Sequence, residues 1–118
     1  TLDRVSAGAL LPLDRGAAGT VILAFDGHER GERYDSARSN FSAMSYGERD
    51  PDCAAIASPV FGPEDKLIGA LSVSGPKPRF TDDGIASMSR LVLHAASHLT
   101  RRLGGRNPQM AALVDGTM

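Results

Sequence analysis

The feature that most constrains the fold is a pair of apolar runs joined by a segment rich in turn-forming residues. The runs are Cys53–Phe61 and Leu67–Ser74, separated by the five residues Gly62-Pro63-Glu64-Asp65-Lys66. Glycine, proline and aspartate favour turns, so the pattern predicts a β-hairpin. Side chains alternate across a strand, and the second run therefore presents two different faces. One face holds Leu67, Gly69, Leu71 and Val73, and the other holds Ile68, Ala70, Ser72 and Ser74.

A long amphipathic helix is predicted after the hairpin, beyond a break at residues 75–78. Thr81 is suited to cap it, and the acidic pair Asp82-Asp83 favours its positive end. Arg101-Arg102 and then Gly104-Gly105 indicate its end, which gives a length of about 22 residues. Apolar residues recur at steps of three and four and predict one buried stripe, expected to pack on the Leu71/Val73 face. The stripe consists of Ile85, Met88, Val92, Ala95, Leu99 and Leu103.

The first third of the chain gives weaker signals. Asp14–Phe25 is predicted to be a short helix capped by Asp14, and Glu29–Ser39 a surface helix or loop, before an extended piece at Phe41–Met44. Residues from Arg106 onward are expected to form a loose tail, residues 106–118. The fold class is therefore α+β, an antiparallel β-sheet with a long C-terminal helix packed on one face.

Composition limits the function classes. The chain has 118 residues, enough for one domain, and a net charge of −1, which disfavours direct contact with nucleic acid. A single cysteine, Cys53, allows no internal disulfide, and no apolar run approaches the length of a membrane span. We therefore expect a cytoplasmic protein without membrane contact. Because the chain starts at Thr1 rather than Met, we expect either a piece of a longer protein or a divergent short relative.

The residues carry no recognisable catalytic arrangement. Paired carboxylates in an apolar setting, a phosphate-binding glycine loop and a nucleophile elbow are all missing from the sequence, and nothing aligns Cys53 with a histidine. His94 and His98 are spaced at i and i+4, which can hold a metal, but solvated or packing histidines fit the pattern better. We expect no enzyme activity, no cofactor and no metal.

Two features could belong to a binding site. Ser72 and Ser74 share a face of an apolar strand and need hydrogen-bond partners if they are buried, although the end of that strand could equally be exposed. The small residues 16–19 leave the start of the first helix bare, so its N–H groups could receive an anion. Small residues would also let that helix pack tightly on the sheet, and both interpretations stay open.

Several segments together resemble the effector-binding domain of IclR-family transcriptional regulators. They are Leu11-Pro12-Leu13 with Gly16-Ala17-Ala18-Gly19, Arg38 to Glu48, Ile56-Ala57-Ser58-Pro59-Val60-Phe61, and Leu71-Ser72-Val73-Ser74-Gly75-Pro76. They occur in the family's order across residues 10–105. The resemblance implies a GAF-like domain, N-terminally incomplete here and spanning residues 1–105, that binds a small effector. DNA would be bound only by a winged helix-turn-helix outside this chain, in a homodimer or homotetramer.

The resemblance also implies a set of pocket residues. They are Leu11, Ala17, Ala18, Ser45, Cys53, Ala55, Ser72 and Ser74. Ala55 stands where many members have cysteine, Ser45 where an acidic residue is frequent, and Phe41-Ser42 where the family has Gly-Tyr. These departures remove metal ligands and predict an effector with an apolar or aromatic body and one carboxylate, held by N–H groups near Ala17–Ala18 and by Ser72 and Ser74. Alternatives are a GAF-like ligand-binding module of another signalling protein, and an oligomerisation module without a ligand.

Overall fold

The centre of the fold is a three-stranded antiparallel sheet. The structure is a computed structural model and describes residues 15–116, so the expectations for Asp14 and Leu11 lie outside it. The strands are β1 (Ala43–Tyr46), β2 (Cys53–Phe61) and β3 (Leu67–Pro76), in the order β1-β2-β3. β2 and β3 form the predicted hairpin, whose loop contains the 3-10 turn Pro63–Asp65.

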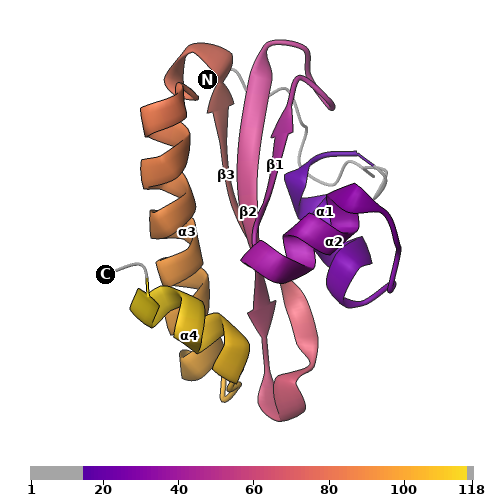
Figure 1. The fold of residues 1–118 in the computed structure, drawn as a ribbon, viewed down its shortest axis with the longest axis vertical. Coiled ribbons are helices and arrows are strands. Elements are labelled where there is room, and N and C mark those ends of the chain that lie inside the picture. The colour runs from indigo at the N-terminus through magenta and orange to yellow at the C-terminus, as the bar shows by residue number, and fades with distance from the viewer. Residues whose placement is uncertain (1–14, 117–118) are drawn as a thin grey trace.

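Helices cover both faces of this sheet. Figure 1 shows α1 (Ala17–Phe25) and α2 (Glu32–Asn40) on one side, and α3 (Asp82–Arg102) and α4 (Pro108–Gly116) on the other. A 3-10 turn, Lys77–Arg79, connects β3 to α3. The predicted α+β class is confirmed, because an antiparallel sheet carries a long C-terminal helix on one face.

β2 contributes to the core on both of its faces. On the α1 side, Ala57 packs with Ala17 and Val21 in one buried cluster. On the α3 side, Ile56 packs with Phe80 and Val92 in another. Both interfaces exclude water from apolar side chains, and this burial is the main favourable term in folding.

The long helix begins and ends as predicted, but its buried face differs. The Thr81 hydroxyl accepts a hydrogen bond from the Gly84 N–H at 3.1 Å, as expected for a cap. The buried α3 residues are Val92, Leu93, Ala96 and Thr100. Leu99 and Leu103 of the predicted stripe are 38% and 43% exposed, and Ala95 is also exposed. The prediction was wrong for this half because Met110 of α4 and the end of β2 cover the side of the helix that carries Leu93, Ala96 and Thr100 instead.

The expectation of a loose tail after Arg106 was wrong. Residues 108–116 form α4, and Met110 is only 1% exposed. The Asn107 side-chain oxygen accepts a hydrogen bond from the Met110 N–H at 3.0 Å, and Pro108 follows it in the first helical position. An Asn-Pro pair is a recognised helix start, so this signal was present in the sequence.

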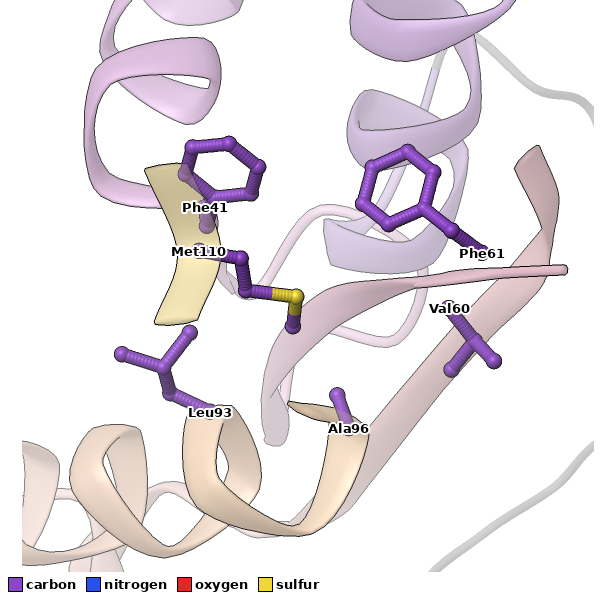
Figure 2. Close-up of a cluster of buried hydrophobic side chains, with 6 residues drawn as sticks. All are labelled: Phe41, Val60, Phe61, Leu93, Ala96 and Met110. Carbon is purple, nitrogen blue, oxygen red and sulfur yellow. The ribbon is translucent and has the colours of Figure 1, made fainter. Parts of the chain in front are cut away.

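An aromatic cluster joins these elements at one end of the sheet. Figure 2 shows Met110 between Phe41 and Leu93, with Phe61, Val60 and Ala96 beside them. The Phe25 and Phe41 ring centroids lie 5.1 Å apart, and those of Phe25 and Phe61 5.6 Å apart. Three of the four phenylalanines of the chain therefore meet here, which compensates for the low aromatic content.

Phe41 carries backbone strain for its place in this cluster. It ends α2 with φ 52° and ψ 35°, a left-handed conformation that glycine adopts freely and a side chain does not. The IclR-family motif that this segment resembles has glycine at this position. Here the side chain is 4% exposed, so burial of the ring offsets the strain.

Because burial of the ring offsets the strain, two substitutions of Phe41 are expected to differ in stability. Phe41→Ala should destabilise the protein by about 3–5 kcal/mol through the cavity it leaves. Phe41→Gly leaves the same cavity but relieves the strain, so it should be about 1 kcal/mol more stable than the alanine variant. Urea unfolding of both variants measures the difference. An alanine variant as stable as the glycine variant would contradict the strain.

Two buried hydroxyl groups, one on α3 and one on β2, differ in their hydrogen bonding. The Thr100 hydroxyl accepts a hydrogen bond from the Phe61 N–H at 3.0 Å and so joins α3 to the end of β2. The Ser58 side chain is fully buried, and its hydroxyl has no hydrogen-bond partner among the described residues. A buried polar group without a partner costs stability, whereas a paired one adds to it.

Opposite effects are therefore expected at these two positions. Ser58→Ala should raise the free energy of unfolding by about 1 kcal/mol, because it removes an unsatisfied hydroxyl. Thr100→Val, which keeps the shape, should lower it by about 1–3 kcal/mol by leaving the Phe61 N–H unpaired. Thermal and urea unfolding test both, and loss of stability in Ser58→Ala would mean that the hydroxyl is in fact satisfied.

Candidate functional site

The strand register gathers predicted pocket residues in one row across the sheet. Ser45 of β1 pairs with Ala55 of β2, and Ala55 pairs with Ser74 of β3. Residues directly opposite one another on neighbouring antiparallel strands point to the same face. This is the face that α1 covers, because Ala55 packs against the cluster formed by Ala17, Val21 and Ala57.

The remaining predicted residues lie on the same face or beside it. Ser72 pairs with Ala57 in the next row, and Cys53 pairs with Pro76 at the other end. Ser45 and Ala17 are buried, Ala18, Cys53 and Ala55 are half-buried, and Ser72 and Ser74 are exposed. The structure thus brings seven predicted residues to one side of the sheet, while Leu11 lies outside the described residues.

The first turn of α1 is packed against polar side chains from other elements. The Glu48 carboxylate accepts a hydrogen bond from the Gly16 N–H at 3.0 Å. The Arg33 guanidinium forms an ion pair with Glu48 and donates to the Thr20 hydroxyl at 2.8 Å. An Arg49 N–H donates to the Arg15 carbonyl oxygen at 2.9 Å. An anion is thus already present at the helix start, where the backbone favours negative charge.

The small residues of this turn also serve packing. Gly16, Ala17 and Gly19 are buried, as is Thr20, whose hydroxyl donates to the Gly16 carbonyl oxygen at 2.8 Å. Both open interpretations of residues 16–19 therefore find support: the helix packs closely on the sheet, and its start binds a carboxylate. Arg33 carried no sequence signal, because it lies in a polar segment far along the chain from its partners.

These contacts act on the acidity of Glu48. Partial burial raises the pKa of its carboxyl group, but the hydrogen bonds from Arg33 and Gly16 and the charges of Arg33 and Arg49 outweigh that effect. The net result is a pKa below the ordinary value of 4.5. Glu48 is therefore ionised at neutral pH, and its cluster has two guanidinium groups for one carboxylate.

A separate cavity of about 300 Å³ lies along the outer edge of β1. Its lining is mostly polar and comes from α1, α2, β1 and α3. It includes Thr20, Arg33, Ser36, Asn40, Ser42, Met44 and Ser89. None of the pocket residues predicted from the sequence lines it.

Residues 15–116 contain no group of three or more histidine, cysteine, aspartate or glutamate side chains arranged to hold a metal. None of their helices is both long and apolar enough to cross a membrane.

The family of the chain follows from comparison with known sequences. The family model described as "Bacterial transcriptional regulator IclR C-terminal" matches residues 32–101, more than half of the chain. The chain belongs to this IclR C-terminal family. The match includes β1, β2, β3 and nearly all of α3, the elements that form the sheet and its long helix.

Individual relatives agree with this assignment. The HTH-type transcriptional regulator KipR of Bacillus subtilis is 30% identical over 73 residues, which cover 62% of this chain and 29% of KipR. A chain from Silicibacter sp. TM1040, described as an IclR transcriptional regulator, superposes with a TM-score of 0.77 at 23% identity, over 91% of this chain and 52% of that one. The repressor BlcR of Agobacterium tumefaciens gives 0.76 at 14% identity, over 86% and 51%.

The sequence matches establish the family, and the structural matches establish the fold. The two solved structures share the fold with this chain. This IclR domain spans under a third of KipR and about half of the two structural neighbours. The relatives are named as transcriptional regulators rather than as enzymes.

The Glu48 contacts predict a pH-dependent stability. A lowered pKa in the folded state means that the ionised carboxylate stabilises the fold above pH 4.5, and that this contribution is lost as the pH falls through the folded-state pKa. Glu48→Gln should therefore lower the stability at pH 7 by about 1 kcal/mol. The difference from the parent chain should shrink below pH 4.5.

Unfolding measured at about one pH value per unit between pH 3 and pH 8 shows how this difference in stability changes with pH. Glu29→Gln is the control, because Glu29 is exposed and lies outside the cluster. A constant difference at all pH values would show that the Glu48 charge does not stabilise the start of α1.

Proposed function

We propose that this chain is the effector-sensing domain of a bacterial DNA-binding transcriptional regulator and that its ligand is a small organic acid. Membership of the IclR C-terminal family supports the regulatory role. The row Ser45–Ala55–Ser74, beside the first turn of α1, supports the location of the site. Hydroxyl groups at the two edges and a small apolar centre suit a ligand with an apolar body and a polar end.

The charges near the row favour an anionic ligand. Arg33 and Arg49 exceed Glu48 by one charge, and the start of α1 adds its partial positive charge. The effector carboxylate would lie between Ala18 and the hydroxyls of Ser72 and Ser74, with its apolar body over Ala55. Because Glu48 already accepts from Gly16, the effector carboxylate would have to share or exchange this helix start with it.

Regulation would follow from a shift between two arrangements of the whole regulator. An effector that binds one arrangement more tightly changes the affinity for DNA by that difference in free energy. DNA contact would be made by a winged helix-turn-helix in another part of the polypeptide, in a dimer or tetramer. Such a regulator would act in the bacterial cytoplasm, without a cofactor and without catalysis by this domain.

Thermal-shift assays with a panel of aromatic and aliphatic carboxylic acids test this proposal. A selective, concentration-dependent rise in melting temperature is expected for acids that bind the folded domain. The double variant Ser72→Ala, Ser74→Ala should weaken that binding about tenfold, since two hydrogen bonds are lost. Ala55→Leu should abolish it by filling the centre of the row.

A matched control separates this site from the cavity at the β1 edge. Ser36→Ala with Ser42→Ala removes two hydroxyls from that cavity and leaves the row intact. Binding lost in this control but kept in the Ser72/Ser74 variant would transfer the site to the cavity. Stabilisation by none of the acids would favour the oligomerisation module instead.

A further inference from the structure

The cavity at the outer edge of β1 has a different character from the candidate effector site. α2 lies beside β1 at this edge (Figure 1), and the volume of about 300 Å³ is enough for a small molecule. Arg33, Ser36 and Asn40 follow one another along α2 at steps of three and four residues, so they line the cavity as one face of the helix. Ser42 of β1 and Ser89 of α3 add a hydroxyl group each. The lining is therefore rich in hydrogen-bonding side chains.

The backbone of β1 adds further hydrogen-bonding groups to this cavity. Among the described strands β1 pairs only with β2, so its other edge faces the cavity. The Gly47 N–H donates to the Cys53 carbonyl oxygen at 2.8 Å. Because bonded positions alternate along an antiparallel pair, Ala43 and Ser45 bond toward β2, and the N–H and carbonyl of Met44 point to the open edge. A ligand in the cavity therefore meets a main-chain donor and acceptor as well as side chains.

Arg33 brings a positive charge with unused hydrogen-bond donors to the cavity. Its Nε–H donates to the Thr20 hydroxyl at 2.8 Å, and its Nη2 group donates to the Glu48 carboxylate. The Nη1 group forms no hydrogen bond with any residue between 15 and 116, and the side chain is 38% exposed. The guanidinium is therefore held in place through one side, and the two N–H groups of Nη1 remain for an anionic ligand.

The charges and the neutral groups of the lining together indicate the class of ligand. Arg33 and Arg49 exceed Glu48 by one positive charge, which a single carboxylate would balance. The neighbouring Asp35 is already balanced by its ion pair with Arg38. Apart from alanine and methionine side chains, the other lining groups are hydroxyls and one amide, which both donate and accept hydrogen bonds. These groups suit a ligand that carries hydroxyl groups of its own.

We propose that this cavity is a second ligand site, for a small carboxylate that carries several hydroxyl groups. The carboxylate would accept hydrogen bonds from Nη1 of Arg33. The hydroxyl groups would bind to Ser36 and Asn40 on the α2 side and to the open edge of β1 on the other. This ligand differs from the effector of the proposed function, whose apolar body would lie over Ala55, and the second site does not depend on that effector.

Arg33 also connects the second site with the start of α1. The same guanidinium forms an ion pair with Glu48, which accepts from the Gly16 N–H at 3.0 Å. A bound carboxylate and Glu48 would share one cation, and their like charges would repel each other. Removal of the Glu48 charge should therefore tighten binding in the cavity. By linkage, a ligand in the cavity should weaken the hold of Arg33 on Glu48 to the same extent.

Titration with three matched compounds, followed in amide NMR spectra of the whole chain, tests the ligand class. The compounds are D-gluconate, sorbitol, which lacks the carboxylate, and hexanoate, which lacks the hydroxyl groups. Gluconate should shift the signals of the residues that line the cavity, with a dissociation constant of about 1 mM. The other two compounds should bind at least about tenfold more weakly, since each lacks half of the interactions. Unchanged signals up to about 30 mM gluconate, shifts confined to Ser72 and Ser74, or equal binding of either control compound would overturn the proposal.

Substitutions of the charged residues test the role of Arg33. Arg33→Gln should weaken gluconate binding at least about tenfold, whereas Arg30→Gln, which removes the same charge from an exposed residue outside the cavity, should leave it unchanged. Glu48→Gln should tighten gluconate binding roughly threefold, a gain that loss of folding cannot produce. The variant Ser72→Ala, Ser74→Ala should bind gluconate like the parent chain, so failure of the effector site and failure of the second site are distinguishable. Equal effects of the two arginine substitutions, or weaker binding in Glu48→Gln, would contradict the proposal.

Discussion

The fold depends on the burial of β2 on both faces. Residues of this strand, Cys53–Phe61, take part in all three apolar clusters: Ala57 with α1, Ala54 and Ile56 with α3, and Val60 and Phe61 with the aromatic group. The hydrogen bond from the Phe61 N–H to Thr100 ties the end of this strand to α3. Because helices cover both sides, β2 determines where α1 and α3 lie relative to one another, and hence where the start of α1 meets the sheet.

The candidate site is a consequence of that placement. α1 begins above the row Ser45–Ala55–Ser74, and the loop after β1 brings Glu48 to the Gly16 N–H. An internal carboxylate thus occupies the helix start that the proposed function assigns to the effector's carboxylate. Exchange between the two anions would connect ligand binding with the loop between β1 and β2, which is a physically simple way to transmit a signal.

The two sides of the sheet have different consequences for function. On the α1 side, small residues such as Ala17, Ala55 and Ala57 allow the helix to pack closely on the sheet. On the α3 side, larger apolar residues fill the interior, and the apolar character continues onto the outer side of the helix.

Much of this architecture could be predicted from the sequence because its signals are local. The turn residues 62–66 and the Thr81 cap each act within a few residues of the chain, and both are found in the structure. The alternation predicted for β3 is not seen in its burial, because Val73 is exposed like its neighbours Ser72 and Ser74. The segments that resemble IclR-family motifs also predicted the family and suggested which residues form the site. The Asn107-Pro108 start of α4 was equally local, and it was missed only because the segment is short.

Tertiary structure alone decided the contacts between distant segments. Nothing near Arg33 in the sequence indicates that it pairs with Glu48, and a helical repeat cannot tell which of two apolar sides will meet the sheet. α3 buries Leu93 and Ala96 and exposes Leu99, because α4 and the end of β2 pack against the side of the helix that carries Leu93 and Ala96. The sequence by itself determined which segments become strands and helices. The packing of β2 decided which of their side chains meet, since burial energy depends on surfaces that exist only once the chain has folded.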